Sequence, residues 1–272
     1  MRTRSVARLS VASIAVALVG SLSSVIAQAQ DLVLGEETQS VAHRGDKEYH
    51  PDNSLAGIES AIAKQADWIE IDLQYNRDGD VFFPSHDNGC SGPGGIALID
   101  TASYEDVVNK CQLPELDDLF DIAHRTGYDS FVYEFKNTPL TASQGGKRLA
   151  QEITAQGFQN DSWVSGFSDI ALDAVREEQP AINLMRVRTW TGEIPLSRTW
   201  IDSTVRRGYG ALNINVDALT PEGVDYAHSQ GLLVSAWGWP DALEEDNQRA
   251  IDLGVDMFMT DRLDHLNMLL SN

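Results

Sequence analysis

Short apolar runs rich in β-branched and aromatic residues alternate along the chain with longer segments in which apolar residues recur at helical spacing. This alternation is typical of strand–helix units around a parallel sheet. Eight runs have strand character: Ser40–His43, Trp68–Gln74, Ser130–Phe135, Ser162–Phe167, Ile182–Val187, Ala211–Val216, Leu232–Trp237 and Asp256–Thr260. Eight parallel strands close a (β/α)₈ (TIM) barrel, so we expect that α/β fold, with a doubly wound open sheet as the alternative.

The segments between the strands carry helix and turn signals. Asn53 precedes apolar residues at helical spacing, and Pro221 follows Thr220 at the start of another helix. A turn-rich segment after the second strand leads into Val81–Ser85, which we expect to pair with that strand as a hairpin. The Gly- and Pro-rich stretch Asn88–Gly95 is short, so it is predicted to be a loop and not a domain boundary.

The beginning of the chain has a different pattern. Three arginines precede the apolar run Val11–Leu22, and small residues follow up to Ala29. This order is typical of a cleaved secretory signal peptide, and the run is short for a membrane anchor, which is the alternative. We expect removal of residues 1–29 and a single exported domain of residues 30–272, periplasmic or extracellular and without a stable membrane anchor. Its length suits one barrel.

The chain is strongly acidic. Without the three arginines of the leader, 17 of the 20 Lys and Arg residues remain against 41 Asp and Glu, a formal net charge of −24. Such a surface repels nucleic acid and anionic membranes, so we expect neither as a partner. It also repels anionic phosphodiesters, so a phosphate site needs positive charge of its own.

The chain has two cysteines, Cys90 and Cys111. An even pair in an exported chain predicts a disulfide, and two unlinked thiols are the alternative. A zinc site is disfavoured because no histidines lie nearby at ligand spacing.

Acidic residues collect where the predicted strands end, the working surface of a parallel barrel. Glu70 and Asp72 lie two apart on the second strand and so share a face, and Glu134 lies on the third. Three unpaired carboxylates repel one another, so we expect them to bind one divalent cation, and oxygen ligands suit Ca²⁺ or Mg²⁺. The alternative is a solvated strand face or an ion pair such as Glu134 with Lys136.

Two histidines lie at the ends of strand runs. His43 ends the first run and His86 follows the hairpin partner, both beside charged neighbours, which suits acid–base work near neutral pH. Arg44 and Lys136 supply local positive charge for a phosphate, although either could simply pair with the carboxylates. Surface or packing roles are expected for the other histidines: His50, His124, His228 and His265.

Trp237 and Trp239 bracket the end of the seventh strand. Alternate residues on a barrel strand point the same way, so both could line the mouth and contact glycerol or a choline head group. Packing against neighbouring loops is the alternative.

Taken in order, these residues form a motif set that resembles glycerophosphodiester phosphodiesterases. The motifs are His43-Arg44-Gly45, Pro51-Asp52-Asn53-Ser54, Glu70-x-Asp72, Asp78-Gly79, His86-Asp87, Glu134-x-Lys136, Ser165-Gly166-Phe167, Trp237, Gly254-Val255-Asp256 and Thr260-Asp261-Arg262. They span nearly all of the chain after the leader. Each motif alone is weak, but seven or more in order are specific.

The resemblance implies a metal-dependent phosphodiesterase that releases glycerol phosphate and an alcohol from a small glycerophosphodiester. In the family's mechanism, a hydroxyl of the substrate's glycerol attacks phosphorus and expels the alcohol, leaving a cyclic phosphate that water opens. The implied roles are cation ligands for Glu70, Asp72 and Glu134, the acid–base pair for His43 and His86, and substrate contacts for Arg44, Lys136 and Trp237.

Three positions depart from the family pattern. Asp52 stands where the family usually has Glu, Asn76-Arg77 replaces a Thr-containing turn, and Asn88-Gly89-Cys90 replaces an Arg-Thr-Thr-like stretch. The Cys-bearing loop after His86 is similar to that of sphingomyelinase D-like phospholipases, relatives on the same barrel. This leaves open a sphingomyelinase D- or lysophospholipase D-like action on lipids. A phosphodiester-binding protein without turnover is a third alternative, although all the matched charged positions are present.

Overall fold

The computed structural model describes residues 37–189, 194–238 and 241–271. The predicted signal peptide and Trp239 lie outside the described residues.

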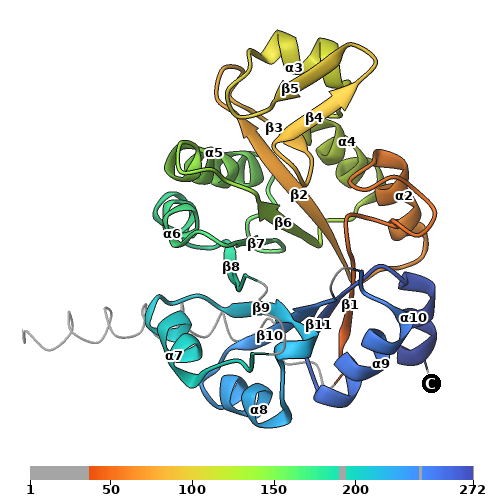
Figure 1. Ribbon diagram of the computed structural model, residues 1–272, viewed down its shortest axis with the longest axis vertical. Helices are drawn as coiled ribbons and strands as arrows, with labels where there is room; N and C mark the ends of the chain where they lie inside the picture. The colour runs from red at the N-terminus through yellow and green to blue at the C-terminus, as the bar shows by residue number, and fades with distance from the viewer. Residues whose placement is uncertain (1–36, 190–193, 239–240, 272) are drawn as a thin grey trace, which may run out of the picture. The chain divides into compact units, whose positions relative to one another are not determined.

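Eight parallel strands form a closed barrel, in which each strand pairs with the next and β1 pairs with both β2 and β11 (Figure 1). The strands are β1 (Gln39–Ala42), β2 (Trp68–Asn76), β6 (Phe131–Phe135), β7 (Trp163–Gly166), β8 (Asn183–Val187), β9 (Ala211–Asn215), β10 (Leu233–Trp237) and β11 (Met257–Thr260). All eight overlap the predicted runs. The prediction of a TIM barrel is confirmed, and closure excludes the open sheet.

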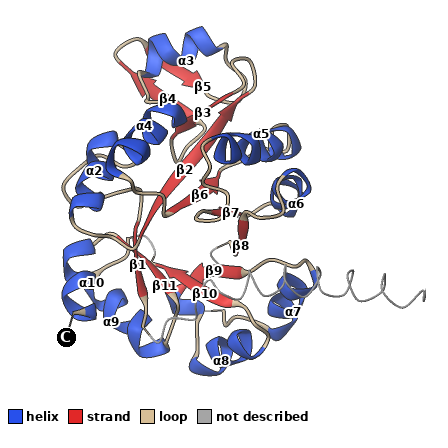
Figure 2. Cartoon of the chain, turned by 180° about the vertical axis from the view of Figure 1, so that it is seen from behind, coloured by secondary structure: helices blue, strands red, loops and turns tan. Residues whose placement is uncertain are grey.

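Helices surround the barrel and cover the outer faces of the strands (Figure 2). They are α2 (Leu55–Ala63), α4 (Leu116–Thr126), α5 (Ala142–Ala155), α6 (Asp169–Glu178), α7 (Arg198–Arg206), α8 (Pro221–Ser229), α9 (Glu244–Leu253) and α10 (Leu263–Leu270), with the 3₁₀ turn η1 (Val216–Ala218) after β9. Thr220 caps α8 and Pro221 occupies its first turn, as the sequence indicates. The cap of α2, however, is Ser54 and not Asn53, which has another function described below.

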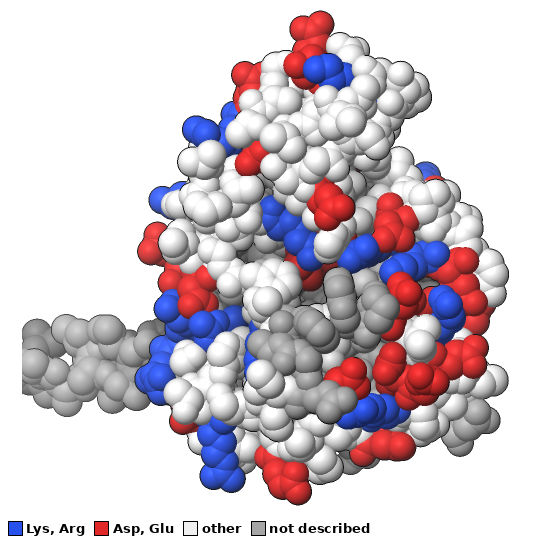
Figure 3. Space-filling model, viewed as in Figure 1, with Lys and Arg blue, Asp and Glu red and all other residues white. Residues whose placement is uncertain are grey.

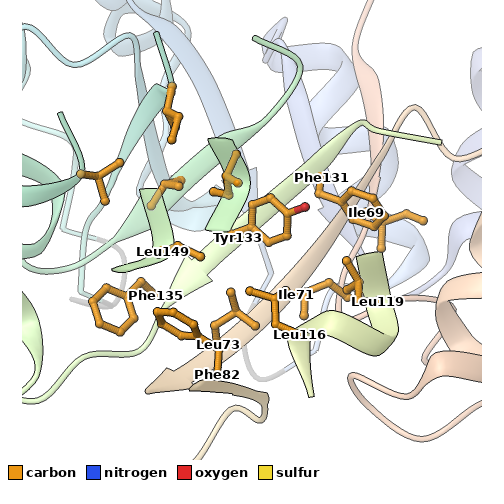
Figure 4. Close-up of a cluster of buried hydrophobic side chains, with 14 of the residues drawn as sticks. Ile69, Ile71, Leu73, Phe82, Leu116, Leu119, Phe131, Tyr133, Phe135 and Leu149 are labelled. Carbon is orange, nitrogen blue, oxygen red and sulfur yellow. The ribbon is translucent and has the colours of Figure 1, made fainter. Parts of the chain in front are cut away.

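The alternation of side chains along β2 divides the core from the barrel interior. Ile69, Ile71 and Leu73 are fully buried and belong to a cluster with Leu116 and Leu119 of α4 (Figure 4). Because successive strand residues point to opposite faces, the residues between them face the interior of the barrel. Burial of the apolar outer face therefore holds Glu70 and Asp72 inside the barrel.

The strand β3 (Val81–Pro84) pairs antiparallel with the end of β2, which confirms the predicted hairpin. A small insertion follows, with the hairpin β4 (Gly89–Gly92) and β5 (Gly95–Leu98) and the helix α3 (Tyr104–Cys111). Figure 3 shows that this insertion, at the top of the view, presents mainly uncharged atoms.

The expected loop at Asn88–Gly95 is therefore largely a β-hairpin, and its glycines explain why. A Cβ added to Gly92 would lie 2.6 Å from the carbonyl oxygen of Lys110. A Cβ added to Gly94 would lie 2.2 Å from the carbonyl oxygen of Asn109. Glycine lets the hairpin lie directly on the end of α3. The prediction of a disulfide is confirmed: Cys90 and Cys111 are linked, with their Cα atoms 5.7 Å apart, and both belong to a small apolar cluster under the insertion.

Candidate active site

His43, just after β1, is held by a buried carboxylate. Its Nδ1 lies 2.7 Å from Oδ1 of Asp261, which follows β11 and has a fully buried side chain. Burial alone would raise the pKa of Asp261, but the hydrogen bond and charge of His43, the Lys47 ammonium at 3.2 Å and the Ala242 N–H lower it to about 2. An ionised Asp261 can only accept, so Nδ1 of His43 carries the proton and Nε2 is the nitrogen that can exchange one.

His86 has a partner of a different kind. Its Nδ1 lies 2.8 Å from Oδ1 of the adjacent Asp87. The side chains of His86 and Asp87 are 41% and 80% exposed, so water screens this pair. The backbone carbonyl of His86 accepts a hydrogen bond from Gln74 on β2, which ties the histidine to the barrel.

Glu70, Asp72 and Glu134 converge inside the barrel. Each offers an oxygen, and these oxygens lie within 4.8 Å of one another. All three residues are buried. Burial, together with the charges of Asp72 and Glu134, raises the pKa of Glu70 well above its usual range. The Oε1 atom of Glu70 is buried without a hydrogen-bond partner, so this cluster has an oxygen available to a cation and could bind a metal ion.

Two cations lie against the carboxylates. The Nε of Arg44 lies 2.9 Å and the Nζ of Lys136 3.1 Å from the Asp72 carboxylate, and Lys136 also contacts Glu134. Burial would lower the pKa of each cation, but the neighbouring carboxylates raise the pKa of both above their ordinary values. Both therefore stay protonated and provide the local positive charge that a phosphate site requires.

Backbone geometry after β1 assembles this cluster. The backbone N–H of Arg44 donates to Glu70 at 2.9 Å, and Asp52 pairs with the Arg44 guanidinium at 2.7 Å. Asn53 adopts a left-handed backbone with φ 56°. Its side-chain Nδ2 donates to Oδ2 of Asp72 at 3.0 Å, and its side-chain Oδ1 accepts from the backbone N–H of Asp72, also at 3.0 Å. Asn53 thus orients the Asp72 carboxylate. The helix that the sequence predicts after Asn53 is capped by Ser54 instead.

A cavity of about 90 Å³, open to solvent, lies above these groups. Its lining comprises His43, Arg44, His86, Glu134, Lys136, Phe167, Val187, Asn213, Trp237, Gly238 and Met259. Six side chains predicted from the sequence therefore meet in one cavity, and Glu70 and Asp72 lie beside it through their contacts with Arg44 and Lys136. Their catalytic and binding roles remain predictions. Trp239 is outside the described residues, and the disulfide is not part of the cavity lining.

The sequence analysis assigned no site role to Asp261 or Asn213, and it gave Asn53 only a place at the start of a helix. Asp261 is 218 residues from its partner His43, and the signals that could have indicated it are its position directly after the last strand and its place in the Thr260-Asp261-Arg262 motif. Asn213 is fully buried, lines the cavity, and has an Oδ1 without a hydrogen-bond partner.

The fold and the site define a class: a TIM-barrel protein with two carboxylate-paired histidines and a three-carboxylate cluster at the mouth. The chain belongs to the glycerophosphoryl diester phosphodiesterase family, whose family model matches residues 43–265.

Several relatives and solved structures are similar to the chain. A glycerophosphodiester phosphodiesterase of Caldanaerobacter subterraneus is 22% identical over 83% of this chain and 94% of that protein. A mouse lysophospholipase D, GDPD3, is 34% identical over 24% of this chain and 20% of its own length. An Oleispira antarctica phosphodiesterase, solved with its product sn-glycerol-3-phosphate, has a TM-score of 0.74 and 18% identity, covering 87% of this chain and 98% of that one.

Proposed function

We propose that this protein hydrolyses glycerophosphodiesters to glycerol phosphate and an alcohol. The observation that carries the proposal is the composition of the cavity. Two histidines, each with its Nδ1 hydrogen-bonded to an aspartate, lie in it with Arg44 and Lys136, and three buried carboxylates lie in or beside it. The names of the full-length relatives and the product bound to the Oleispira protein support the choice of substrate. The positive charge of Arg44 and Lys136 provides for the phosphate what the acidic surface does not.

We further propose that Glu70, Asp72 and Glu134 hold one divalent cation, Ca²⁺ or Mg²⁺. The unpartnered Oε1 of Glu70 and the all-oxygen donor set support this choice. A bound cation would polarise the phosphate and balance negative charge. It would also replace the proton that burial favours on Glu70.

The different partners of the two histidines support a division of labour. His43 takes the proton at Nε2 from the attacking glycerol hydroxyl, because the buried Asp261 stabilises the imidazolium that results. His86, whose partner is exposed to water, gives its proton to the departing alcohol oxygen. The attack on phosphorus leaves a cyclic phosphate, and the roles reverse when water opens it.

Turnover of glycerophosphocholine tests this proposal, with choline and glycerol phosphate measured separately. We expect release of both products, its loss in excess chelator, and its recovery when Ca²⁺ or Mg²⁺ is restored. A phosphorus NMR signal of cyclic glycerol phosphate in a single turnover would support the two-step route. Full turnover in excess chelator would exclude the cation, and binding without any product would favour a receptor.

We also propose that the protein is exported after removal of residues 1–29. The disulfide supports an oxidising compartment. Among the described residues, no helix is long and apolar enough to cross a membrane. Mass spectrometry of the protein secreted by its host tests the cleavage, and an intact leader would contradict it.

A further inference from the structure

Asn213 is a buried polar side chain at the cavity to which neither the acid–base steps nor the cation site gives a role. It lies on β9, is fully buried and lines the cavity. Its amide oxygen Oδ1 has no hydrogen-bond partner in the described part of the chain. Buried polar atoms are nearly always hydrogen-bonded, because burying an amide without a partner costs free energy. An unpartnered acceptor at the cavity wall is therefore a candidate contact for a ligand.

The barrel and one side-chain contact fix the direction of this amide. Asn213 pairs with Val187 of β8 on one side and with Ser235 of β10 on the other, so neighbouring strands hold its backbone. Its Nδ2 lies 3.3 Å from the sulfur of Met259, which also lines the cavity. A thioether sulfur accepts hydrogen bonds but has no proton to donate, so the NH₂ group faces the sulfur and the oxygen faces away from it. The side chain thus keeps one acceptor for a ligand.

The surroundings of Asn213 determine what kind of group it can bind. In the closed barrel β9 lies across from β2, where Arg44 and Lys136 contact the Asp72 carboxylate. Those cations attract a phosphate, whereas the partial negative charge of an amide oxygen repels phosphate oxygens. The apolar cavity residues on the side of β9 are Phe167, Val187, Trp237 and Met259. This wall disfavours an ammonium ion, which would lose its hydration there, and suits a neutral hydroxyl that donates one hydrogen bond.

The position of the first base indicates which part of the substrate reaches Asn213. His43 receives the proton of the attacking glycerol hydroxyl, and its partner Asp261 directly follows β11, the strand that carries Met259. His86 lies on the other side of the mouth, after β3, which pairs with β2. The glycerol therefore lies on the side of Met259 and Asn213, and the departing alcohol lies toward His86.

We propose that Asn213 is a specificity-determining residue whose amide oxygen accepts a hydrogen bond from the terminal hydroxyl of the glycerol. Attack by the hydroxyl beside the phosphate-bearing carbon closes a five-membered cyclic phosphate, so the terminal hydroxyl takes no part in bond making and is free to bind. Asn213 thus selects glycerophosphodiesters whose terminal hydroxyl is free over diesters that lack it. This inference rests on the proposed phosphodiesterase function and on His43 as the first base.

The first experiment compares glycerophosphocholine with the phosphocholine diester of 1,2-propanediol, which keeps the attacking hydroxyl and lacks the terminal one. For the wild type we expect kcat/KM to be about 10- to 100-fold lower for the propanediol diester, because this substrate leaves the buried acceptor of Asn213 unpaired. Asn213→Leu keeps the approximate volume of the side chain and should reduce the ratio between the two substrates to within about threefold. A wild-type ratio near one overturns the proposal, as does a full ratio in Asn213→Leu.

Ser235→Ala is the matched control. Ser235 lies beside Asn213 on the neighbouring strand, is fully buried, and has an Oγ without a hydrogen-bond partner among the described residues. It is absent from the cavity lining that the described residues form. Ser235→Ala should therefore keep the wild-type ratio. Loss of the ratio in this variant as well would show that it depends on the polar interior of the barrel and not on a contact with Asn213.

A second experiment measures binding without turnover, by calorimetry with sn-glycerol 3-phosphate and with 1,2-propanediol 1-phosphate of the same configuration. Wild type and Ser235→Ala should bind glycerol phosphate about 10- to 100-fold more tightly, and Asn213→Leu should bind both about equally. Asn213→Ala takes the place of Asn213→Leu if circular dichroism shows that the leucine variant does not fold. Equal binding of the two phosphates by the wild type overturns the proposal.

The two measurements separate this proposal from the proposed function. Failure of the wild type to hydrolyse glycerophosphocholine with Ca²⁺ or Mg²⁺ present counts against the phosphodiesterase function itself. The binding ratio still decides in that case whether Asn213 recognises the hydroxyl. Turnover of glycerophosphocholine together with a ratio near one would leave the phosphodiesterase function standing and remove the role of Asn213.

Discussion

The two halves of the barrel mouth differ in chemistry. The charged half comes from β1, β2, β3 and β6 and contains His43, Arg44, Glu70, Asp72, His86, Glu134 and Lys136. The apolar half comes from the neighbouring strands β7 to β11. It contributes Phe167, Val187, Trp237 and Met259 to the cavity lining, together with the amide side chain of Asn213.

The two halves are under different physical constraints, charge balance in one and shape in the other. In the charged half most side chains are tied to each other by ion pairs and hydrogen bonds, so a change at one alters the charge balance of the rest. In the apolar half shape dominates, because no ionisable group from β7 to β10 lines the cavity among the described residues. We therefore expect mutations in the charged half to change kcat and mutations in the apolar half to change substrate preference.

The largest expected effect comes from His43→Ala. Loss of the general base should lower kcat for glycerophosphocholine about 10²- to 10⁴-fold, while Phe167→Ala in the opposite half should leave kcat for this substrate within a few-fold. Steady-state kinetics on both variants measures the contrast. Equal losses would show that the two halves do not act separately.

The disulfide tests whether the insertion belongs functionally to the charged half, since it follows His86 directly. Opening the loop closed by Cys90 and Cys111 with a double Ser substitution should reduce the free energy of unfolding by about 3 kcal/mol. Denaturant unfolding measures this loss. Because the disulfide does not line the cavity, kcat should fall less than tenfold; a larger drop at a temperature where the variant is folded would place the insertion within the catalytic machinery.

Asp261→Asn tests how the charged half positions its base. The substitution keeps the shape but removes the buried charge behind His43, and we expect a roughly 10²-fold lower kcat with little change in KM. Asp87→Asn is the control, because Asp87 is the exposed partner of His86 and should have a smaller effect. The pH dependence of kcat should change shape for Asp261→Asn alone. The reverse ranking would contradict the assignment of His43 as the first base.

Acid stability gives the smallest effect. The pKa of Asp261 is about 2 in the folded protein, below its unfolded value of about 3.9, so its ionised form stabilises the fold. This contribution, about 2.6 kcal/mol, is present above pH ~4 and is lost as the pH falls from about 4 to about 2. Wild type should therefore lose more free energy of unfolding than Asp261→Asn across this window. Parallel curves for the two proteins would show that the depressed pKa is absent.

Much of the fold follows from local patterns in the sequence. The period-2 alternation of β2 alone places Ile69 and Ile71 on one face and Glu70 and Asp72 on the other, so both the strand and the shared direction of the carboxylates were predictable. The hairpin at Asn88–Gly95 was not, because its glycines also suit a loop, and their close approach to α3 exists only in the folded chain.

The sequence by itself determined the eight strands, the residues at their ends and the pair of cysteines, because these depend on periodicity and on residue type. The tertiary structure decided which side chains meet. Pairing of β1 with β11 closes the barrel and brings Asp261 to His43, and the return of the chain after β1 brings Asn53 to Asp72. Only closure joins residues so distant along the chain, and for that reason the asymmetry between the two histidines exists in the structure and not in the sequence.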